Sequence, residues 1–140
     1  MKKLLSLLPI LVLLSFSTSA QVTKLVSTYN QVGIYNKYLE KYDWNPHNYA
    51  TITIYFGKQM IWMDNISESQ FRITGRRGEN TGVNNDGISW KDFTWIAIDN
   101  KGRRCDVSLT KFNDNTLMFV ILYDDLCFRY FANSSGLDNF

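Results

Sequence analysis

Apolar and polar side chains alternate through most of residues 93–131, and three short turns interrupt the alternation. A period of two is typical of β-strands that bury one face. The first turn contains Asp99 and Gly102, the second spans residues 113–115, and the third is Asp124-Asp125. Asp, Asn and Gly favour hairpin turns because they accept the backbone conformations that these turns need. The region therefore predicts four antiparallel strands joined by hairpins.

The turns also predict which residues of neighbouring strands lie opposite each other. In this register one sheet face is wholly apolar or aromatic, whereas a shift by one residue would place Arg104, Asp106 and Ser108 on it. Turn chemistry and burial thus favour the same register. The predicted pairs are Asp99 with Arg103, Phe112 with Thr116, and Tyr123 with Leu126. The predicted core face consists of Phe93, Trp95, Ala97, Cys105, Val107, Leu109, Leu117, Phe119, Ile121, Tyr123, Leu126, Phe128 and Tyr130.

The opposite face keeps more apolar side chains than a solvated sheet face normally does. Ile96, Val120 and Leu122 lie there in the predicted register, together with Ile98 and Met118. One interpretation is that the N-terminal part of the chain, or the curvature of the sheet, covers these side chains. The other is an exposed patch that meets a partner. Ile96, Val120 and Leu122 are therefore candidate binding residues.

The N-terminal half of the chain predicts further strands. Residues 49–56 alternate cleanly and form a hairpin with residues 60–63, and one or two strands lie within residues 21–41. Residues 42–48, which contain Asn, Asp and Pro, are expected to form a loop.

The region before residue 93 predicts one more strand, at residues 70–74, followed by a long irregular loop. Four glycines within residues 75–87 favour that loop. The fold class is therefore all-β: a single small antiparallel β-meander of about eight strands that closes as a barrel. The alternative is a two-sheet β-sandwich.

Residues 1–20 have the pattern of a secretory signal peptide. Lys2 and Lys3 precede the apolar residues 4–16, and the small residues 17–20 suit cleavage. The apolar run is too short to span a membrane comfortably. We expect residues 21–140 to form one exported domain, located in the periplasm or outside a bacterium.

Charge gives little indication of a partner. Without Lys2 and Lys3, thirteen basic residues balance thirteen acidic ones, so the mature chain is formally neutral. Nucleic-acid binding domains are usually strongly basic. We therefore expect no nucleic-acid partner.

The two cysteines are not expected to form a disulfide, although export would permit one. The predicted register places Cys105 and Cys127 on opposite faces and two strands apart. Next-nearest strands are separated by about 10 Å, which exceeds the ~7 Å Cα limit for a disulfide.

Catalytic and metal-binding motifs are not evident. His47 is the only histidine, and no neighbouring residue has ligand spacing. Residues 84–87 have some features of a calcium loop, but too few carboxylates follow them. We expect neither a metal, nor a cofactor, nor an enzymatic activity.

Aromatic residues make up 15% of the chain. Trp95 falls on the predicted core face, whereas Trp44 and Trp90 lie near predicted loops. Flat rings on a rigid β-surface can stack on sugars or line a ligand pocket. Trp44 and Trp90 are therefore candidate binding residues.

Short strands, with Asp99-x-x-Gly102 followed by Cys105, resemble small exported bacterial β-proteins, and this resemblance implies no activity. The sequence favours a non-enzymatic binding or interaction module of the cell envelope, which would bind a protein partner or form a homodimer. The alternative is a lipocalin-like small barrel that binds an apolar small molecule. Large aromatics leave such a barrel little interior space. A cavity at Phe119 and Phe128 would favour the barrel, and a filled core with an exposed apolar patch would favour the interaction module.

Overall fold

The computed structural model describes residues 23–64 and 69–133, in which all regular structure is β-strand. The all-β prediction is confirmed, although the strands number ten. The predicted signal peptide lies outside the described residues. The strands are β1 (Thr23–Ser27), β2 (Tyr29–Asn36), β3 (Lys41–Trp44), β4 (Ile52–Phe56), β5 (Met60–Met63), β6 (Gln70–Val83), β7 (Ser89–Asp99), β8 (Arg104–Phe112), β9 (Thr116–Leu122) and β10 (Leu126–Asn133).

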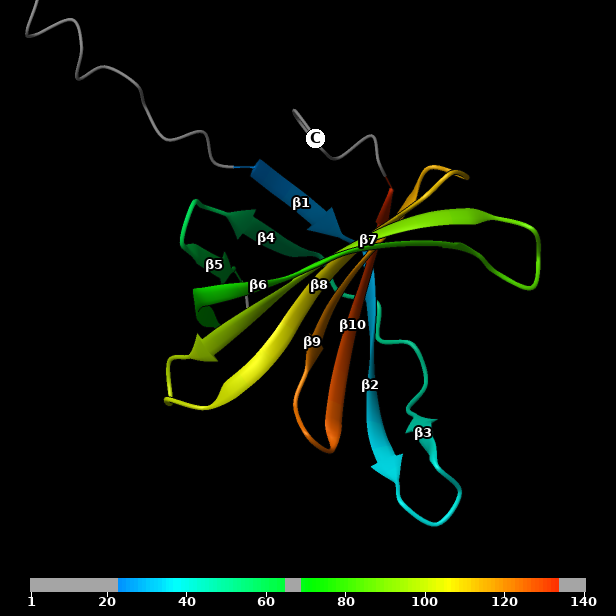
Figure 1. Cartoon of the computed structure of the whole chain (residues 1–140), viewed down its shortest axis with the longest axis horizontal. Helices are drawn as coiled ribbons and strands as arrows, with labels where there is room; N and C mark the ends of the chain where they lie inside the picture. Colours follow the sequence, from blue (N-terminus) through cyan, green and yellow to red (C-terminus); the bar gives the residue numbers. More distant parts are fainter. Residues whose placement is uncertain (1–22, 65–68, 134–140) are drawn as a thin grey trace, which may run out of the picture.

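The ten strands form one antiparallel sheet in the order β1-β4-β5-β6-β7-β8-β9-β10-β2-β3 (Figure 1). Strands β4 to β10 are a meander, as predicted. The sheet is not closed into a barrel and is not divided into two sheets, so neither the predicted barrel nor the alternative sandwich is confirmed. The edge strands β1 and β3 do not pair with each other. At Thr28 the chain passes from β1, which pairs with β4, to β2, which pairs with β10. There Thr28 N–H and Ser27 Oγ–H both donate to Phe131 O, at 3.2 and 3.0 Å.

The three predicted registers are confirmed. Asp99 N–H donates to Arg103 O at 2.9 Å, and Tyr123 N–H donates to Leu126 O at 2.8 Å. Lys111 lies opposite Leu117, which places Phe112 opposite Thr116. The turn residues Gly102 and Asn115 have φ values of +80° and +69°, the left-handed conformation that these residue types tolerate best.

Two predicted loops are partly strand. Within the expected loop at residues 75–87, β6 continues to Val83 and pairs with β7. Register shifts at Ile73/Gly75 and Arg76/Gly78 show that two of the glycines accommodate bulges within the strand, and Gly78 has a φ of +135°. Residues 42–44, also expected in a loop, belong to β3. The hairpins β2–β3 and β6–β7 project from the body of the protein (Figure 1).

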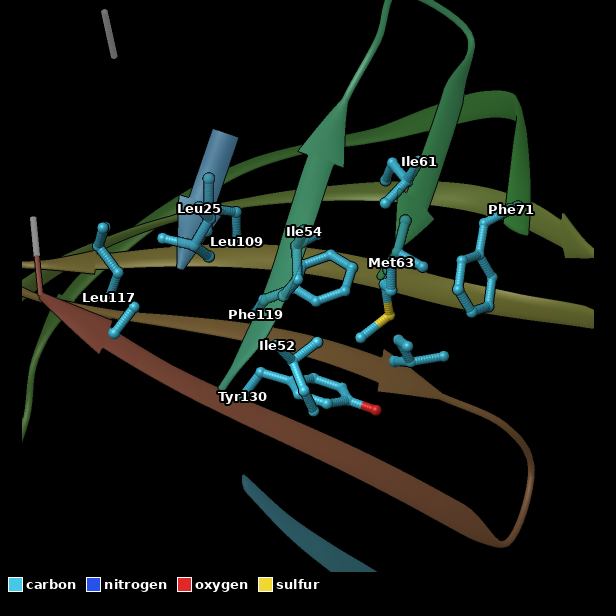
Figure 2. Close-up of a cluster of buried hydrophobic side chains, with 14 of the residues drawn as sticks. Leu25, Ile52, Ile54, Ile61, Met63, Phe71, Leu109, Leu117, Phe119 and Tyr130 are labelled. Carbon is cyan, nitrogen blue, oxygen red and sulfur yellow. The ribbon is translucent and has the colours of Figure 1, made fainter. Parts of the chain in front are cut away.

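The sheet coils over itself, and its inner face forms the core. Figure 2 shows side chains of β1, β4, β5 and β6 gathered with those of β8, β9 and β10. Phe119 is fully buried at the centre and meets the edge of the Phe56 ring at 5.4 Å between centroids. The predicted core face is confirmed except at Phe93 and Leu126, which are half-buried and do not belong to the core cluster. Its buried members are Ala97, Cys105, Val107, Leu109, Leu117, Phe119, Ile121 and Tyr130, and those half-buried against the core are Trp95, Tyr123 and Phe128.

We predict that Phe119→Ala lowers the free energy of unfolding by about 3–5 kcal/mol, because it leaves a cavity in the centre of the core. Denaturant unfolding measures this loss. Val120→Ala is the matched control, since Val120 lies next in β9 but is half-buried on the other face. We expect the control to cost about 1 kcal/mol or less. Equal losses for the two variants would contradict the assignment of the faces.

Candidate functional site

The outer face is the side of β6–β10 that points away from the core, and it carries the three aliphatic candidate residues. Ile96 and Val120 are half-buried there, and Leu122 is 37% exposed. Gly75 lies opposite Ile96 in the β6–β7 pairing, and a Cβ atom added at Gly75 would lie 3.6 Å from Ile96 Cδ1, an ordinary contact between neighbouring strands. Tyr42 of β3 lines a cleft together with Leu122. The β2–β3 hairpin therefore borders the outer face at Leu122.

Trp44 holds β3 against its neighbours. The Arg129 guanidinium lies 3.3 Å from the centroid of the Trp44 ring, and its Nη2–H donates to Gln31 Oε1 at 2.7 Å. The indole also lies against Gly33, where an added Cβ would come within 2.7 Å of Cε3. Burial lowers the pKa of Arg129 from its ordinary value because it disfavours the charged form. The Trp44 ring is thus engaged by a cation–π contact that joins β2, β3 and β10.

His47 belongs to an aromatic cluster next to this contact. Its ring meets Tyr29 at 5.1 Å and Phe131 at 6.1 Å between centroids, and Tyr29 stacks on Phe131 at 4.7 Å. Packing against rings gives His47 a structural role. Among residues 23–64 and 69–133, no three metal-ligating side chains come together.

Trp90 lies at a separate site, which we call the Trp90 pocket. This shallow pocket on the outer face has a volume of about 370 Å³, within the range of about 300–1,000 Å³ that is usual for small-molecule sites. Four strands contribute to it, in two adjacent rows. One row is Asn80, Asp92, Thr110 and Met118, which lie opposite one another across β6, β7, β8 and β9. The other row is Gly82, Trp90 and Phe112. Asn84 completes the lining.

A glycine sets the position of the Trp90 indole. Trp90 lies opposite Gly82, and a Cβ atom added there would be only 2.5 Å from Trp90 Cζ2. The indole can therefore lie directly on the β6 backbone. No described residue accepts a hydrogen bond from its Nε1–H, so this donor remains available to a ligand.

Two hydroxyl groups hold the carboxylate of Asp92. Thr110 Oγ1–H donates to one Asp92 oxygen and Thr94 Oγ1–H donates to the other, both at 2.8 Å. A carboxylate oxygen accepts more than one hydrogen bond, so Asp92 keeps acceptor capacity. The two threonines thus fix the orientation of the Asp92 carboxylate, which can still accept further hydrogen bonds.

The amide of Asn84 is also oriented. Its Oδ1 accepts the backbone N–H groups of Asp86 and Ile88, at 3.0 and 2.9 Å, within the turn that ends the β6–β7 hairpin. This leaves the Asn84 Nδ2 group as a donor at the pocket. The pocket therefore combines an aromatic wall with oriented donors and acceptors.

A larger cleft, of about 750 Å³, lies elsewhere on the outer face, between the β7–β8 and β9–β10 turns. Two of its three arginines are already paired: Arg77 with Asp106 and Arg103 with Asp99, each at 2.8 Å. A ligand would have to compete with these ion pairs. We therefore give this cleft less weight than the Trp90 pocket.

Asp99 is the centre of a hydrogen-bonded cluster beside that cleft. It accepts hydrogen bonds from Tyr123 Oη–H and from the side chain and backbone of Arg103, each at 2.8 Å, and from Lys101 N–H at 2.9 Å. Burial opposes the ionisation of Asp99, but these hydrogen bonds outweigh it and lower the pKa below its ordinary value. The Tyr123 pKa is raised by burial and by the bond to Asp99. These hydrogen bonds stabilise the conformation of the β7–β8 turn.

The two cysteines are free and buried. Cys105 lies on the core face, and Cys127, opposite Leu122, lies on the outer face with β9 between them. Burial, followed by the nearby charge of Asp99, raises the pKa of Cys105 to about 11. At neutral pH it is therefore a thiol and a poor nucleophile.

A third cavity opens at the mouth of the coiled sheet and bears on the alternative of an enclosed ligand. Its volume is about 250 Å³, and Phe71, Phe128 and Tyr130 contribute to its lining. Phe119 is fully buried and does not line it. The interior is thus filled at its centre by Phe119, and this cavity lies outside that centre.

The site residues inferred from sequence are only partly brought together. Trp90 lies in the pocket, Leu122 lines the large cleft, and Trp44 packs against Arg129. Asn80, Asn84, Asp92, Thr110, Phe112 and Met118 were missed. The predicted hairpin registers already place Asp92, Thr110 and Met118 in one row. Asn80 extends this row because β6, which includes part of the predicted loop at residues 75–87, pairs with β7.

No protein-family model matches the chain, and searches of curated proteins and of solved structures find no match either. Within residues 23–64 and 69–133 there is no helix of the length and apolarity that crossing a membrane requires. The function is therefore argued from the site.

We predict that part of the stability of the protein is lost at acid pH through Asp99. Because the folded-state pKa of Asp99 is depressed, its contribution is complete above the unfolded-state value of about 4 and is lost as the pH falls through the folded-state pKa. Urea unfolding between pH 7 and pH 2 should therefore show a weaker pH dependence in Asp99→Asn than in the wild type. Asp124→Asn, in an exposed turn, is the control and should behave as the wild type. An unchanged pH dependence in Asp99→Asn would contradict this role.

Proposed function

We propose that the protein is an exported, non-enzymatic binding module of the bacterial cell envelope, which holds its ligand in the Trp90 pocket. One observation carries the proposal: an indole seated on Gly82 lies beside a carboxylate oriented by Thr94 and Thr110. Orienting polar groups next to an open aromatic surface reduces the entropy lost when a ligand binds. This arrangement does not serve the core, because it lies on the outer face.

The states of the reactive side chains support a binding role rather than catalysis. Cys105 is buried with a pKa raised to about 11, so it is not activated. Asp99 accepts four hydrogen bonds and is 6% exposed. His47 packs among aromatic rings. None of these groups is placed to transfer a proton to a ligand in the Trp90 pocket.

A lipocalin-like site for an apolar small molecule is the second candidate. The cavity beside Phe71, Phe128 and Tyr130 supports it. Its volume of about 250 Å³ is smaller than that of the Trp90 pocket, and below the usual lower bound of about 300 Å³ for ligand sites. The outer pocket is therefore the better-supported site.

The row Ile96, Val120 and Leu122 has less support as the contact surface for a protein partner or for a second copy of the chain. Ile96 and Val120 are half-buried, and only Leu122 is counted among the exposed large apolar side chains. Stable interfaces usually need a contiguous patch of about 800 Å² on each partner. We therefore place the ligand contact at Trp90.

We predict that a bacterial host which expresses the whole chain exports it and removes residues 1–20. The expected product is found in the periplasm or the medium with Gln21 at its N-terminus, as N-terminal sequencing and intact mass would show. A variant without residues 2–20 is the control and should remain in the cytoplasm. Recovery of the intact chain from the cytoplasm would contradict export.

We predict that small ligands perturb the indole of Trp90 and not the indoles of Trp44, Trp62 and Trp95. The experiment is a fragment screen by ¹H–¹⁵N NMR, with compounds that are neutral, cationic, anionic and apolar. Signals are assigned by single Trp→Phe substitutions. Ligand-induced shifts should concentrate on Trp90 and the residues that line its pocket. Hits that shift only residues of the inner cavity, such as Phe128, would instead support the lipocalin-like candidate.

A further inference from the structure

We infer that the Trp90 pocket recognises a neutral saccharide, with one pyranose ring stacked on the indole. This inference rests on the proposed function, since it names the ligand class for the same pocket.

The wall suits a flat and partly apolar ligand. Trp90 lies against Gly82, with Phe112 directly opposite on β8, and Met118 of β9 lies in the adjacent row. A pyranose presents C–H groups on one face and hydroxyl groups around its rim. Aromatic side chains bind such faces because they remove apolar surface from water and offer a π-surface to C–H groups. A stacked ring would therefore place its hydroxyls near the polar residues of the pocket.

The rim offers donors and acceptors together. The Asp92 carboxylate accepts hydrogen bonds, Trp90 Nε1–H and Asn84 Nδ2 donate, and the Asn80 amide can do both. A sugar hydroxyl both donates and accepts, so it needs such a mixed set. A cationic ligand without acceptor atoms would leave the donors Trp90 Nε1–H and Asn84 Nδ2 unpaired, whereas a sugar hydroxyl can pair with them and with Asp92.

The charge of the pocket disfavours an anion. Its lining contains one ionisable side chain, Asp92, and no Lys or Arg. An anionic ligand would meet the negative charge of Asp92 without a compensating cation. The pocket is also shallow and open, which suits one unit of a longer chain better than an enclosed small molecule. The geometry therefore points to a neutral oligosaccharide or polysaccharide.

The test measures binding of defined oligosaccharides to the mature protein by isothermal titration calorimetry and by the Trp90 indole NMR signal. The neutral probes are tetrasaccharides of cellulose, xylan, mannan, chitin and maltose type. The comparison probes are tetragalacturonate, which is anionic, and choline, which is cationic. We expect at least one neutral tetrasaccharide to bind and to shift the Trp90 indole, and neither charged probe to do so.

Three variants examine the contacts. Trp90→Ala and Asp92→Asn should each weaken binding of that tetrasaccharide by about tenfold or more. Gly82→Ala keeps Trp90 but forces the indole to move, and it should weaken binding similarly. The control is Trp62→Ala, since Trp62 stacks on Tyr55 at 5.3 Å between centroids and does not line the pocket. Circular dichroism of each variant separates loss of binding from loss of fold.

The outcomes separate this inference from the proposed function. A charged or apolar probe that shifts Trp90, with no neutral saccharide binding, overturns the saccharide class and leaves the pocket a binding site. A saccharide that binds equally well to folded Trp90→Ala and Asp92→Asn overturns the inference too. If no compound of any class perturbs Trp90, both the inference and the proposed function are wrong.

Discussion

Burial of one apolar face by a single sheet that coils over itself fixes the position of almost every other side chain. Phe119, fully buried in the centre of that face, packs against Phe56 from the other side of the coil. Because side chains alternate across a strand, the register that buries Phe119 also decides which residues point outward. The rows that carry Asp92 and Trp90 are therefore a consequence of how the core is packed.

Two tryptophans make the same kind of contact with a neighbouring strand but have different roles. Each lies on a glycine of the neighbouring strand, Trp44 on Gly33 and Trp90 on Gly82, where an added Cβ would come within 2.7 and 2.5 Å of the ring. Aromatic rings placed over glycines protect the exposed backbone and help to fix register. Arg129 then covers Trp44 with a cation–π contact. Trp90 has no such cover among the described residues, and this difference is what makes it a candidate ligand platform.

The sequence predicted what depends on local chemistry and missed what depends on long-range pairing. The turns at Gly102 and Asn115 identified the register because only a few residue types accept their left-handed conformations. The glycines of residues 75–87 were interpreted as a loop, although β7 pairs with them and bulges absorb the irregularity. The predicted barrel is not seen because the two edge strands, β1 and β3, do not pair with each other. The role of Trp44 depends on Arg129, which lies far away in the sequence and adjacent only through the β10–β2 pairing.

The most direct test of this account is the contact between Trp90 and Gly82 in solution. Nuclear Overhauser effects between the indole ring protons and the Gly82 Hα protons report this distance. The account predicts strong effects and Gly82 Hα signals displaced by the ring current, since the indole lies in close contact with the glycine. Unshifted Gly82 Hα signals with no effects to Trp90 would mean that the indole is not seated on β6. The register of β6 with β7, and the pocket built on it, would then be wrong.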